Sequence, residues 1–396
     1  MLDDVDGLDE LLRRHLSVAG FTSPVVLQTR RRATSVGLSD ERAAGLGSRL
    51  LGESNRARQA SDRVVFLDVE TTGLNAGAGT LIFLIGLAYM VDSHVVVEQF
   101  FLHEPAAEPF LLRKLSDRLR EFEVMVTFNG KSFDLPMVVG RFALHRLAAP
   151  LPPMHLDLLH PCRRIWGRRL GQTTLGALEA RILGVTRDRD VPGAEVPRRY
   201  FEFLRSRDVA PMTAVLLHNQ ADLLAMIGLA ERIEFFLADV RRAEASGSSD
   251  LLGLGTLCEL RGLIEEAKQC YSTALVGATS MERAEALHRL AALVDQDVDL
   301  ARVVDLLMAV ANYPFERALP ASIQLAKIFE HRTREHVRAL AYANRALALT
   351  DSSSPQRKAG LTSSLGRRIA RLERKIDRST VDQEARLVAG LVTNSV

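Results

Sequence analysis

The stretch VVFLDVETTGLN, from Val64 to Asn75, decides the fold. It begins as an apolar run typical of a buried strand, yet it carries two carboxylates, Asp68 and Glu70. Residues i and i+2 of a strand point to the same face of a sheet. The two acids are therefore expected to stand side by side at the end of a hydrophobic strand, where their charges need compensation.

Further apolar runs follow this stretch and predict a mixed sheet. Residues 81–91 and 95–102 are expected to be strands joined by the tight turn DSH. Residues 124–128 have the pattern of a short buried strand, and residues 152–157 that of a fifth strand. Segments with helical spacing of apolar residues, such as residues 108–122, lie between them. We predict an α/β domain in which helices flank a mixed five-stranded sheet.

The C-terminal third has only helical patterns. Residues 251–275, LLGLGTLCELRGLIEEAKQCYSTAL, have the small and apolar positions of the 34-residue helical hairpin repeat. Residues 335–349 put Ala339, Ala343 and Ala346 in the same relation. We predict two or three degenerate tetratricopeptide-like repeats, with a generic helical bundle as the alternative. The basic run RRIARLERKIDR, at residues 367–378, is expected to be a solvated helix.

Composition suggests four parts. Residues 1–60 are expected to be a basic, partly disordered extension with one short helix; its stretch QTRRRATS is either a solvated lead or an auxiliary nucleic-acid contact. Residues 61–240 form the α/β domain. Residues 241–250, RRAEASGSSD, have the small residues of a linker, and residues 251–396 form the helical domain.

Bulk properties exclude some classes of protein. The 396 residues have a net charge of +2, which argues neither for nor against a polyanionic partner. The acidic start, MLDDVDG, is unlike a signal peptide, and the most apolar window, residues 81–91, is too short to span a bilayer. We expect no membrane segment. Three scattered cysteines, Cys162, Cys258 and Cys270, favour a reducing cytoplasm over a disulfide framework.

Two more acids gain meaning beside Asp68 and Glu70. Asp134, in TFNGKSFDLP, follows the strand at residues 124–128, although it could also be a helix N-cap. Asp222, in LLHNQADLLAM, lies on an apolar helix with His218 one turn earlier. Because i and i+4 share a helix face, His218 and Asp222 can point at one spot.

Four converging carboxylates would repel one another. At about 4 Å, each like-charged pair costs about 4 kcal/mol at an effective dielectric constant of 20. Oxygen ligands favour hard cations such as Mg²⁺ or Mn²⁺. Two such ions about 4 Å apart form the known clamp for in-line attack on a phosphodiester. A pair of divalent cations would therefore explain why these acids are tolerated.

The motifs resemble a known family. Asp68-x-Glu70 followed by TTGL, then NGKSFD, then a final helix with HNQAD, are similar to the three motifs of the DEDD exonucleases, a branch of the ribonuclease H-like superfamily. Longer segments, HLDLLH, RRIWGRRLGQTTLGALEARILGVTRDRDVPG and PRRYFEFL, resemble the bacterial YprB-type ribonuclease H-like proteins. The likeness covers about residues 63–232. It implies a ribonuclease H-like fold, 3′–5′ digestion and two bound metal ions.

The resemblance also assigns roles. It implies that Asp68 bridges both metals, that Glu70 and Asp222 share the nucleophile-side metal, and that Asp134 holds the other. His218 would orient or deprotonate the attacking water. The positions that cup the terminal nucleotide in the family correspond here to Thr71, Thr72 and Leu74.

The spacing of His218 departs from the family pattern. In the histidine-type enzymes the histidine lies five residues before the last Asp, and in the tyrosine-type enzymes the tyrosine lies four before. Here a histidine has the tyrosine-type spacing, since His218 is four residues before Asp222.

Other residues suit substrate contacts. Asn129 and Lys131 lie just before Asp134, where Lys131 could meet a phosphate. The region after His160 is rich in arginine, whose guanidinium groups suit bidentate phosphate contacts, although a solvated charged face is the alternative. The densest cluster contains Arg163, Arg164, Arg168 and Arg169.

A zinc site is not favoured. The segment MHLDLLHPC contains His155, Asp157, His160 and Cys162, but one cysteine and short mixed gaps match no structural zinc pattern. Asp157 is expected instead to cap the helix that follows it.

Three functions are compatible with these patterns. The first is a metal-dependent 3′–5′ exonuclease on single-stranded DNA or RNA, with helical repeats that contact a protein partner. The second is a catalytically weak or silent nucleic-acid-binding or scaffold protein with the same fold. The third is a hydrolase of short oligonucleotides. Retention of all four acids favours the first.

Overall fold

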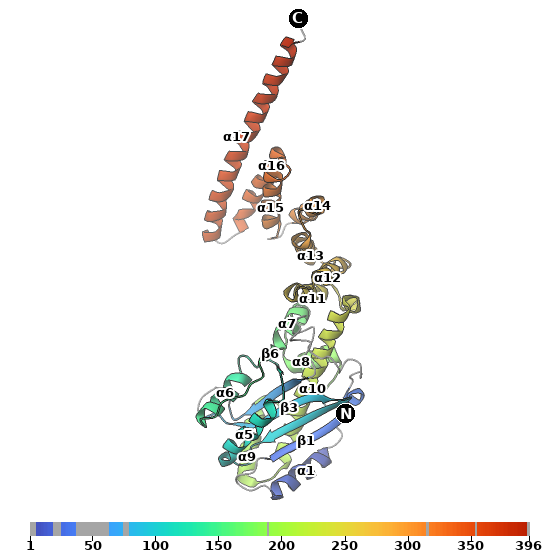
Figure 1. Ribbon diagram of the computed structural model, residues 1–396, viewed down its shortest axis with the longest axis vertical. Coiled ribbons are helices and arrows are strands. Elements are labelled where there is room, and N and C mark those ends of the chain that lie inside the picture. Colours follow the sequence, from blue (N-terminus) through green and yellow to red (C-terminus); the bar gives the residue numbers. More distant parts are fainter. Residues whose placement is uncertain are drawn as a thin grey trace. The chain divides into compact units, whose positions relative to one another are not determined.

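The protein forms two compact units, residues 1–242 and 243–396, which are shown in Figure 1. The computed structural model describes residues 5–18, 25–36, 63–73, 79–187, 190–313, 317–352 and 355–393. The first unit combines a sheet with helices, and the second is helical throughout its described part. The prediction of a ribonuclease H-like α/β domain followed by an all-α region is confirmed.

The sheet has six strands in the order β1-β4-β3-β2-β5-β6. The pairs β1/β4, β4/β3 and β3/β2 are antiparallel, while β2/β5 and β5/β6 are parallel, so the sheet is mixed as expected. Its strands are β1 (Val25–Arg32), β2 (Val64–Thr71), β3 (Ile82–Val91), β4 (His94–Phe101), β5 (Val124–Thr127) and β6 (Met154–Asp157).

The strand count of five was too low because β1 comes from the N-terminal segment. β1 pairs with β4 along its whole length, from Val25 opposite Phe101 to Arg32 opposite His94. Val25 and Leu27 are buried, whereas the side chains after them are partly or fully exposed. At the edge of a sheet, backbone hydrogen bonds to one neighbour suffice, so a polar strand can form there. The predicted loose extension thus includes a strand, and residues 37–62 lie outside the described residues.

Helix α10, Ala210–Ala238, is the central helix of the first unit and contacts β2, β3 and β4. It is apolar nearly all round, as expected for a helix buried between the sheet and other elements. The other helices of this unit are α1 (Val5–Val18), α5 (Glu108–Leu119), α6 (Asp134–Leu144), α7 (Leu159–Leu170), α8 (Leu175–Leu178) and α9 (Val196–Ser206). Short 3-10 segments are Ala33–Val36, Pro105–Ala107, Gly193–Glu195 and Val240–Ser246, and Glu179–Leu183 is a π-helical turn.

The second unit is a series of helices in which each packs against the next along the chain. The small residues picked out in the sequence lie at these contacts: Ala339, Ala343 and Ala346 are buried, and a Cβ on Gly255 would lie 2.6 Å from the Tyr271 ring. The helices are α11 (Ser248–Arg261), α12 (Ile264–Ala274), α13 (Ser280–Leu293), α14 (Leu300–Ala311), α15 (Ala318–His331), α16 (His336–Ala348) and α17 (Pro355–Thr393), with a 3-10 turn at Leu349–Ser352.

Two expectations drawn from composition can be compared with the structure. Within the described ranges, every helix is too short or too polar to cross a membrane. All three cysteines are buried free thiols.

Candidate active site

Strand β2 delivers the first two acids of the candidate site. Asp68 lies opposite Gly86 of β3, and Glu70 lies two residues further on the same face, opposite Leu84. The register of the β2/β3 pair shifts between Glu70 and Thr71, so regular pairing ends directly after the second acid. The acids stand at the end of a buried strand, as the sequence predicted.

Asp134 is the first residue of α6 rather than its N-cap, which is Phe133. Parallel pairing between β2 and β5 ends at Phe66 opposite Val126, so the backbone of β2 beyond that point is open on the β5 side. The amide of Val69, between the two β2 acids, donates to the Asp134 carboxylate. Asp134 thus lies beside Asp68 and Glu70.

Helix α10 supplies His218 and Asp222 one turn apart. His218 Nε2 lies 3.6 Å from Asp222 Oδ2 and 3.9 Å from Glu70 Oε1. The three side chains are 13 to 18% exposed, so the cluster is mostly buried but reaches solvent. The structure therefore brings together all five residues that the sequence singled out for catalysis.

A buried chain of amides on α10 and β4 holds Asp68. Asn219 Nδ2 donates to Asp68 Oδ2 at 2.8 Å, and Gln99 Nε2 of β4 donates to Asn219 Oδ1 at 2.8 Å. Gln220 Nε2 donates to Gln99 Oε1 at 3.0 Å. A Cβ on Gly86 would lie 2.2 Å from Asn219 Oδ1, so only glycine lets α10 approach the sheet this closely.

The acids raise one another's pKa values. Burial, followed by the charges of Asp222, Glu70 and Asp134, raises the pKa of Asp68 well above its usual range. Burial also raises the pKa of Glu70 to about 8, with Asp222 and Asp134 adding to it and His218 opposing. Burial raises the pKa of Asp134 to about 7, although the amides of Asp134 and Val69 partly offset this effect. The described side chains around the cluster do not fully compensate the negative charge of the ionised acids. A bound cation would compensate it.

The environment of His218 favours its protonated form. Burial lowers the pKa of His218, but the charge of Asp222, the hydrogen bond that His218 donates to Asp190 and the charge of Glu70 outweigh burial and raise it overall. His218 Nδ1 lies 2.5 Å from Asp190 Oδ1, which leaves Nε2 facing the acids.

Sequence reasoning missed three charged neighbours of the site. Arg187 binds Asp222, Glu179 and Asp190, and Asp190 binds His218. Arg187 and Asp190 lie in the charged run VTRDRDVPG, which carries no periodic signal. Asn219 had a detectable signal, because an amide within the apolar pattern of α10 indicates a buried polar contact.

The threonines predicted to cup a nucleotide shape the turn after β2. Thr71 Oγ1 donates to the carbonyl of Gly73 at 2.8 Å, and Thr72 Oγ1 accepts from the Leu81 amide at 2.9 Å. Leu74 lies outside the described residues.

The remaining predicted substrate contacts are on the surface. Asn129 and Lys131 are exposed in the loop between β5 and α6. The arginines of the predicted basic cluster are exposed side chains of α7, and their contact with substrate stays a prediction: Arg163, Arg164, Arg168 and Arg169.

Asp157 organises that loop rather than a zinc site. Its carboxylate accepts from the amides of Asn129 at 2.8 Å and Lys131 at 3.2 Å. It also accepts from the amide of Leu159, the first residue of α7, at 3.1 Å, but the N-cap of that helix is Leu158, so the predicted capping position of Asp157 was wrong by one residue. His155 Nε2 is engaged with Thr127 Oγ1 at 2.8 Å. The loop that leads into Asp134 is thus fixed by β6.

The acid cluster is not a closed metal cage as it stands. Within the described ranges, no group of three or more His, Cys, Asp or Glu side chains is arranged to hold a metal ion. Asp68 is bonded to an amide and Asp222 to a guanidinium, while the donor set itself is all carboxylate oxygen apart from His218. This donor chemistry fits Mg²⁺ or Mn²⁺, and the side chains would have to close around the ions.

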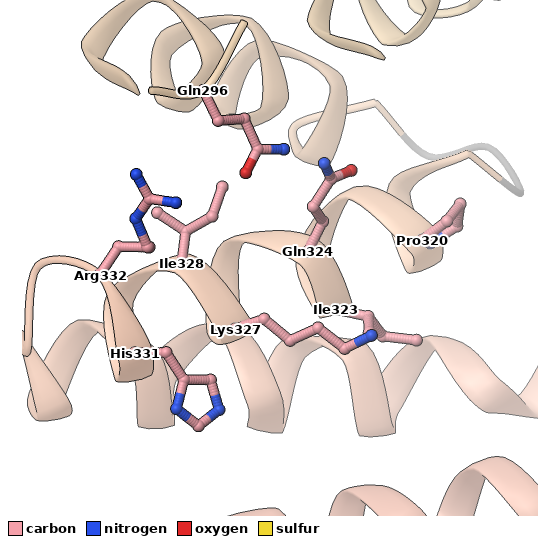
Figure 2. Close-up of a pocket in the computed structure, with 8 residues that line it drawn as sticks. All are labelled: Gln296, Pro320, Ile323, Gln324, Lys327, Ile328, His331 and Arg332. Atoms are coloured by element: carbon pink, nitrogen blue, oxygen red, sulfur yellow. The ribbon is translucent and has the colours of Figure 1, made fainter. Parts of the chain in front are cut away.

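A pocket of about 590 Å³ belongs to the helical unit and contains none of the predicted site residues. In Figure 2, Gln296 faces Gln324, Ile328 and Arg332 across it, while His331 points away. Arg332 is ion-paired with Asp297. The pocket is lined by Gln296, Pro320, Ile323, Gln324, Lys327, Ile328, His331 and Arg332.

The sequence is similar to known proteins over much of its length. Residues 65–234 match the RNase H superfamily. The chain is 31% identical over 335 residues to the uncharacterized protein YprB of Bacillus subtilis (strain 168), which covers 79% of this chain and 75% of that protein. Among solved structures, a family B DNA polymerase from the archaeon Pyrobaculum calidifontis matches with 18% identity and a TM-score of 0.36. That match covers 53% of this chain and 29% of the polymerase chain. The superfamily match over the sheet and the extended similarity show that the chain belongs to the YprB family, with an RNase H-like domain.

Proposed function

We propose that this protein is a 3′–5′ exonuclease of the DEDD type that hydrolyses phosphodiester bonds of single-stranded nucleic acid with two divalent metal ions. One observation carries the proposal: acids from β2, α6 and α10 converge, and burial and the neighbouring charges raise the pKa values of Asp68, Glu70 and Asp134. Perturbed carboxylates gathered at one place are typical of functional sites.

The residues divide the work between holding cations and moving a proton. Asp68, Glu70, Asp134 and Asp222 would hold the two ions, Mg²⁺ or Mn²⁺. When bound, such ions would offset the negative charge that develops on the phosphate and its leaving oxygen. Asn219 keeps one oxygen of Asp68 occupied and leaves the other for a cation.

His218 would take the proton of the attacking water. Its Nε2 faces Glu70 and Asp222, while Nδ1 is held by Asp190. A base must be unprotonated to act, and the raised pKa of His218 means that a more alkaline solution is needed for this. Bound cations beside it would oppose this shift, because they neutralise the acids that cause it.

The substrate is expected to run past the end of β2. Thr71, Thr72 and Leu74 would cup the terminal nucleotide there, with Asn129 and Lys131 on the neighbouring loop. The exposed arginines of α7 would contact phosphates further along the strand.

The helical unit is proposed to bind a protein partner as a tetratricopeptide-like region. The support is its stack of consecutive helices, with small residues such as Gly255 and Ala339 at their contacts. Repeat units of this kind present extended surfaces for partners.

A second function is favoured by one observation. Asp222 is bound by Arg187, and the described residues form no ready metal cage. A chain that binds nucleic acid on the same fold without cutting it would have these features.

A product-ladder assay separates the two functions. Full-length protein is incubated with 5′-labelled single-stranded DNA or RNA in Mg²⁺, Mn²⁺ or EDTA. We expect a ladder that shortens from the 3′ end with either metal and no change in EDTA.

Asp68→Asn should abolish the ladder, whereas Asp117→Asn should not, because Asp117 is an exposed acid of α5 paired with Arg120. Binding without cutting under every metal condition would contradict the exonuclease proposal and support the silent one.

A further inference from the structure

Arg187 is a mostly buried cation whose three nitrogens each meet a different acid. Its Nη2 lies 2.6 Å from Asp222 Oδ1, its Nε 2.6 Å from Glu179 Oε2, and its Nη1 3.3 Å from Asp190 Oδ2. Its side chain is 10% exposed. A planar guanidinium with all its nitrogens engaged has a fixed orientation, and it fixes the carboxylates it binds.

The same network reaches His218. Asp190 meets Arg187 with Oδ2 and His218 Nδ1 with Oδ1, at 3.3 and 2.5 Å. Arg187 therefore acts on Asp222 directly and on His218 through Asp190. Both targets lie one turn apart on α10, where Oδ2 of Asp222 and Nε2 of His218 face each other at 3.6 Å.

The segment that carries Arg187 is packed firmly on α10. Leu183 ends the π-helical turn Glu179–Leu183 and lies over Gly228, where a Cβ would come within 2.9 Å of its Cδ1. Glu179, at the start of that turn, is buried and accepts a hydrogen bond from Arg187 Nε. The guanidinium is thus held by Glu179 of the turn as well as by Asp222 of α10.

The charge balance decides whether Arg187 would oppose a metal ion. The guanidinium carries one positive charge, and Glu179 and Asp190 together carry two negative charges. Without Asp222, the network is therefore negative when His218 is neutral and uncharged overall when His218 is protonated, so in neither form does it carry a net positive charge that would repel a cation. Asp222 uses Oδ1 for Arg187, and a carboxylate has about four acceptor sites, so Oδ2 is left for a metal.

We propose that Arg187 is a positioning residue of the nuclease site, which orients Asp222 for metal binding and, through Asp190, orients His218. The inference rests on the exonuclease function proposed above. Partners of metal-binding carboxylates commonly act in this way, and their loss costs about 10 to 100-fold in metal affinity or activity.

Calorimetric titration of the full-length protein with Mn²⁺, without substrate, tests the direct role. Arg187→Gln should weaken Mn²⁺ binding by about 10 to 100-fold. Arg187→Lys keeps the positive charge but loses the planar guanidinium that binds several carboxylates at once. Its affinity for Mn²⁺ should therefore lie between those of wild type and Arg187→Gln.

Arg118→Gln is the matched control. Arg118 binds Glu98 at 2.7 Å in a half-buried pair, and Glu98 is adjacent in β4 to Gln99, so the two side chains point to opposite faces of the sheet. The control should keep wild-type Mn²⁺ affinity to within about twofold.

Asp190→Asn tests the indirect role. It removes the charged partner of His218 Nδ1 but leaves the contacts of Arg187 with Asp222 and Glu179. We expect Mn²⁺ affinity within about twofold of wild type and kcat lower by about tenfold or more, with KM little changed.

The outcomes distinguish this inference from the proposed function. If wild-type protein binds no Mn²⁺, the proposed function itself fails. If wild type binds Mn²⁺ and folded Arg187→Gln binds it equally well or more tightly, the positioning role is overturned, and tighter binding would identify Arg187 as a competitor of the metal. If Arg187→Gln does not fold, the other two variants decide. The positioning role is overturned if Arg187→Lys binds Mn²⁺ as tightly as wild type and Asp190→Asn has the wild-type kcat.

Discussion

Glu70 and Glu330 are both mostly buried glutamates, and the protein treats them in opposite ways. Glu70 lies among other acids, and burial raises its pKa to about 8. Burial would also raise the pKa of Glu330 on α15, but hydrogen bonds from Arg371 and Lys375 and the charge of Arg368 outweigh it and lower that pKa to about 2. The helical unit neutralises Glu330, whereas the RNase H-like unit leaves Glu70 and the acids around it in mutual repulsion.

The difference distinguishes acids that stabilise the fold from acids that can bind a ligand. An acid paired with cations of its own chain stabilises the folded state, but its oxygens are already occupied and do not bind a ligand. A group of unmatched acids weakens the fold and gains most from a bound cation, because the repulsion is relieved on binding. The following predictions test this contrast, from the largest expected effect to the smallest.

Asp68→Asn should reduce exonuclease activity the most. Loss of one of the four carboxylates proposed to hold the ions would remove several kcal/mol of transition-state stabilisation, which corresponds to about 10³-fold or more in rate. The same change should leave the melting temperature in EDTA equal or higher, because the cost of burying an ionisable group among other acids is gone while Asn219 still finds an acceptor. Labelled-oligonucleotide cleavage and thermal melting measure the two effects. A large fall in melting temperature would mean that Asp68 is a stabilising acid, like Glu330.

Glu330→Gln should have the opposite profile. It leaves Arg368, Arg371 and Lys375 without their shared carboxylate, and because these cations are partly exposed we expect a loss of about 2 kcal/mol. For a unit of this size, this loss corresponds to a fall of about 4 to 8 °C in melting temperature. Glu373→Gln, at an exposed position of α17, is the control. If the melting temperature of Glu330→Gln equals that of wild type, Glu330 does not stabilise the helical unit and the contrast with Glu70 fails.

The two sites should respond differently to pH. In folded protein without metals, Glu70 and Asp134 keep their protons up to about pH 8 and 7, whereas in the unfolded chain they lose them near their ordinary values of 4.5 and 3.8. The folded state binds more protons over this range, so the free energy of unfolding should fall as pH rises from about 5 to 8. Glu330 has a lowered pKa, so its stabilising effect is present above about pH 4.5 and is lost as pH falls towards 2.

Melting in EDTA at several pH values between 5 and 8 checks this prediction. Glu70→Gln should flatten the slope, and saturating Mn²⁺ should do so as well, because it favours the ionised acids. A wild-type melting temperature that does not change with pH would contradict the raised pKa values.

Removal of the helical unit should have the smallest effect. The acids, His218 and their neighbours all belong to residues 1–242, so a chain ending at Arg242 should fold and cleave short oligonucleotides within about twofold of the full-length rate. Retained folding with lost cleavage would indicate that the helical unit completes the site.

Much of the first unit could be predicted from the sequence because its signals are local. The β2 run with Asp68 and Glu70, and the apolar helix with His218 and Asp222, each carry their pattern within one element. β1 could not be predicted, since only two of its residues are buried and the rest of its support is the backbone of β4.

The network around Arg187 was also out of reach. Its partners Glu179 and Asp222 lie 8 and 35 residues away, and ion pairs impose no periodicity on the sequence. The basic run at residues 367–378 was wrongly interpreted as merely solvated, for the same reason: Glu330 lies 38 residues before Arg368.

The hydrogen bond from Asn219 to Asp68 joins residues 151 positions apart. During synthesis at about 5 to 20 residues per second, Asp68 is made roughly 8 to 30 s before Asn219. Until then, Asp222 does not yet exist, and the early strands can pair without the charge repulsion that burial against α10 later imposes. The order of the elements in the chain thus lets the sheet form first and delays assembly of the acids until α10 has been made.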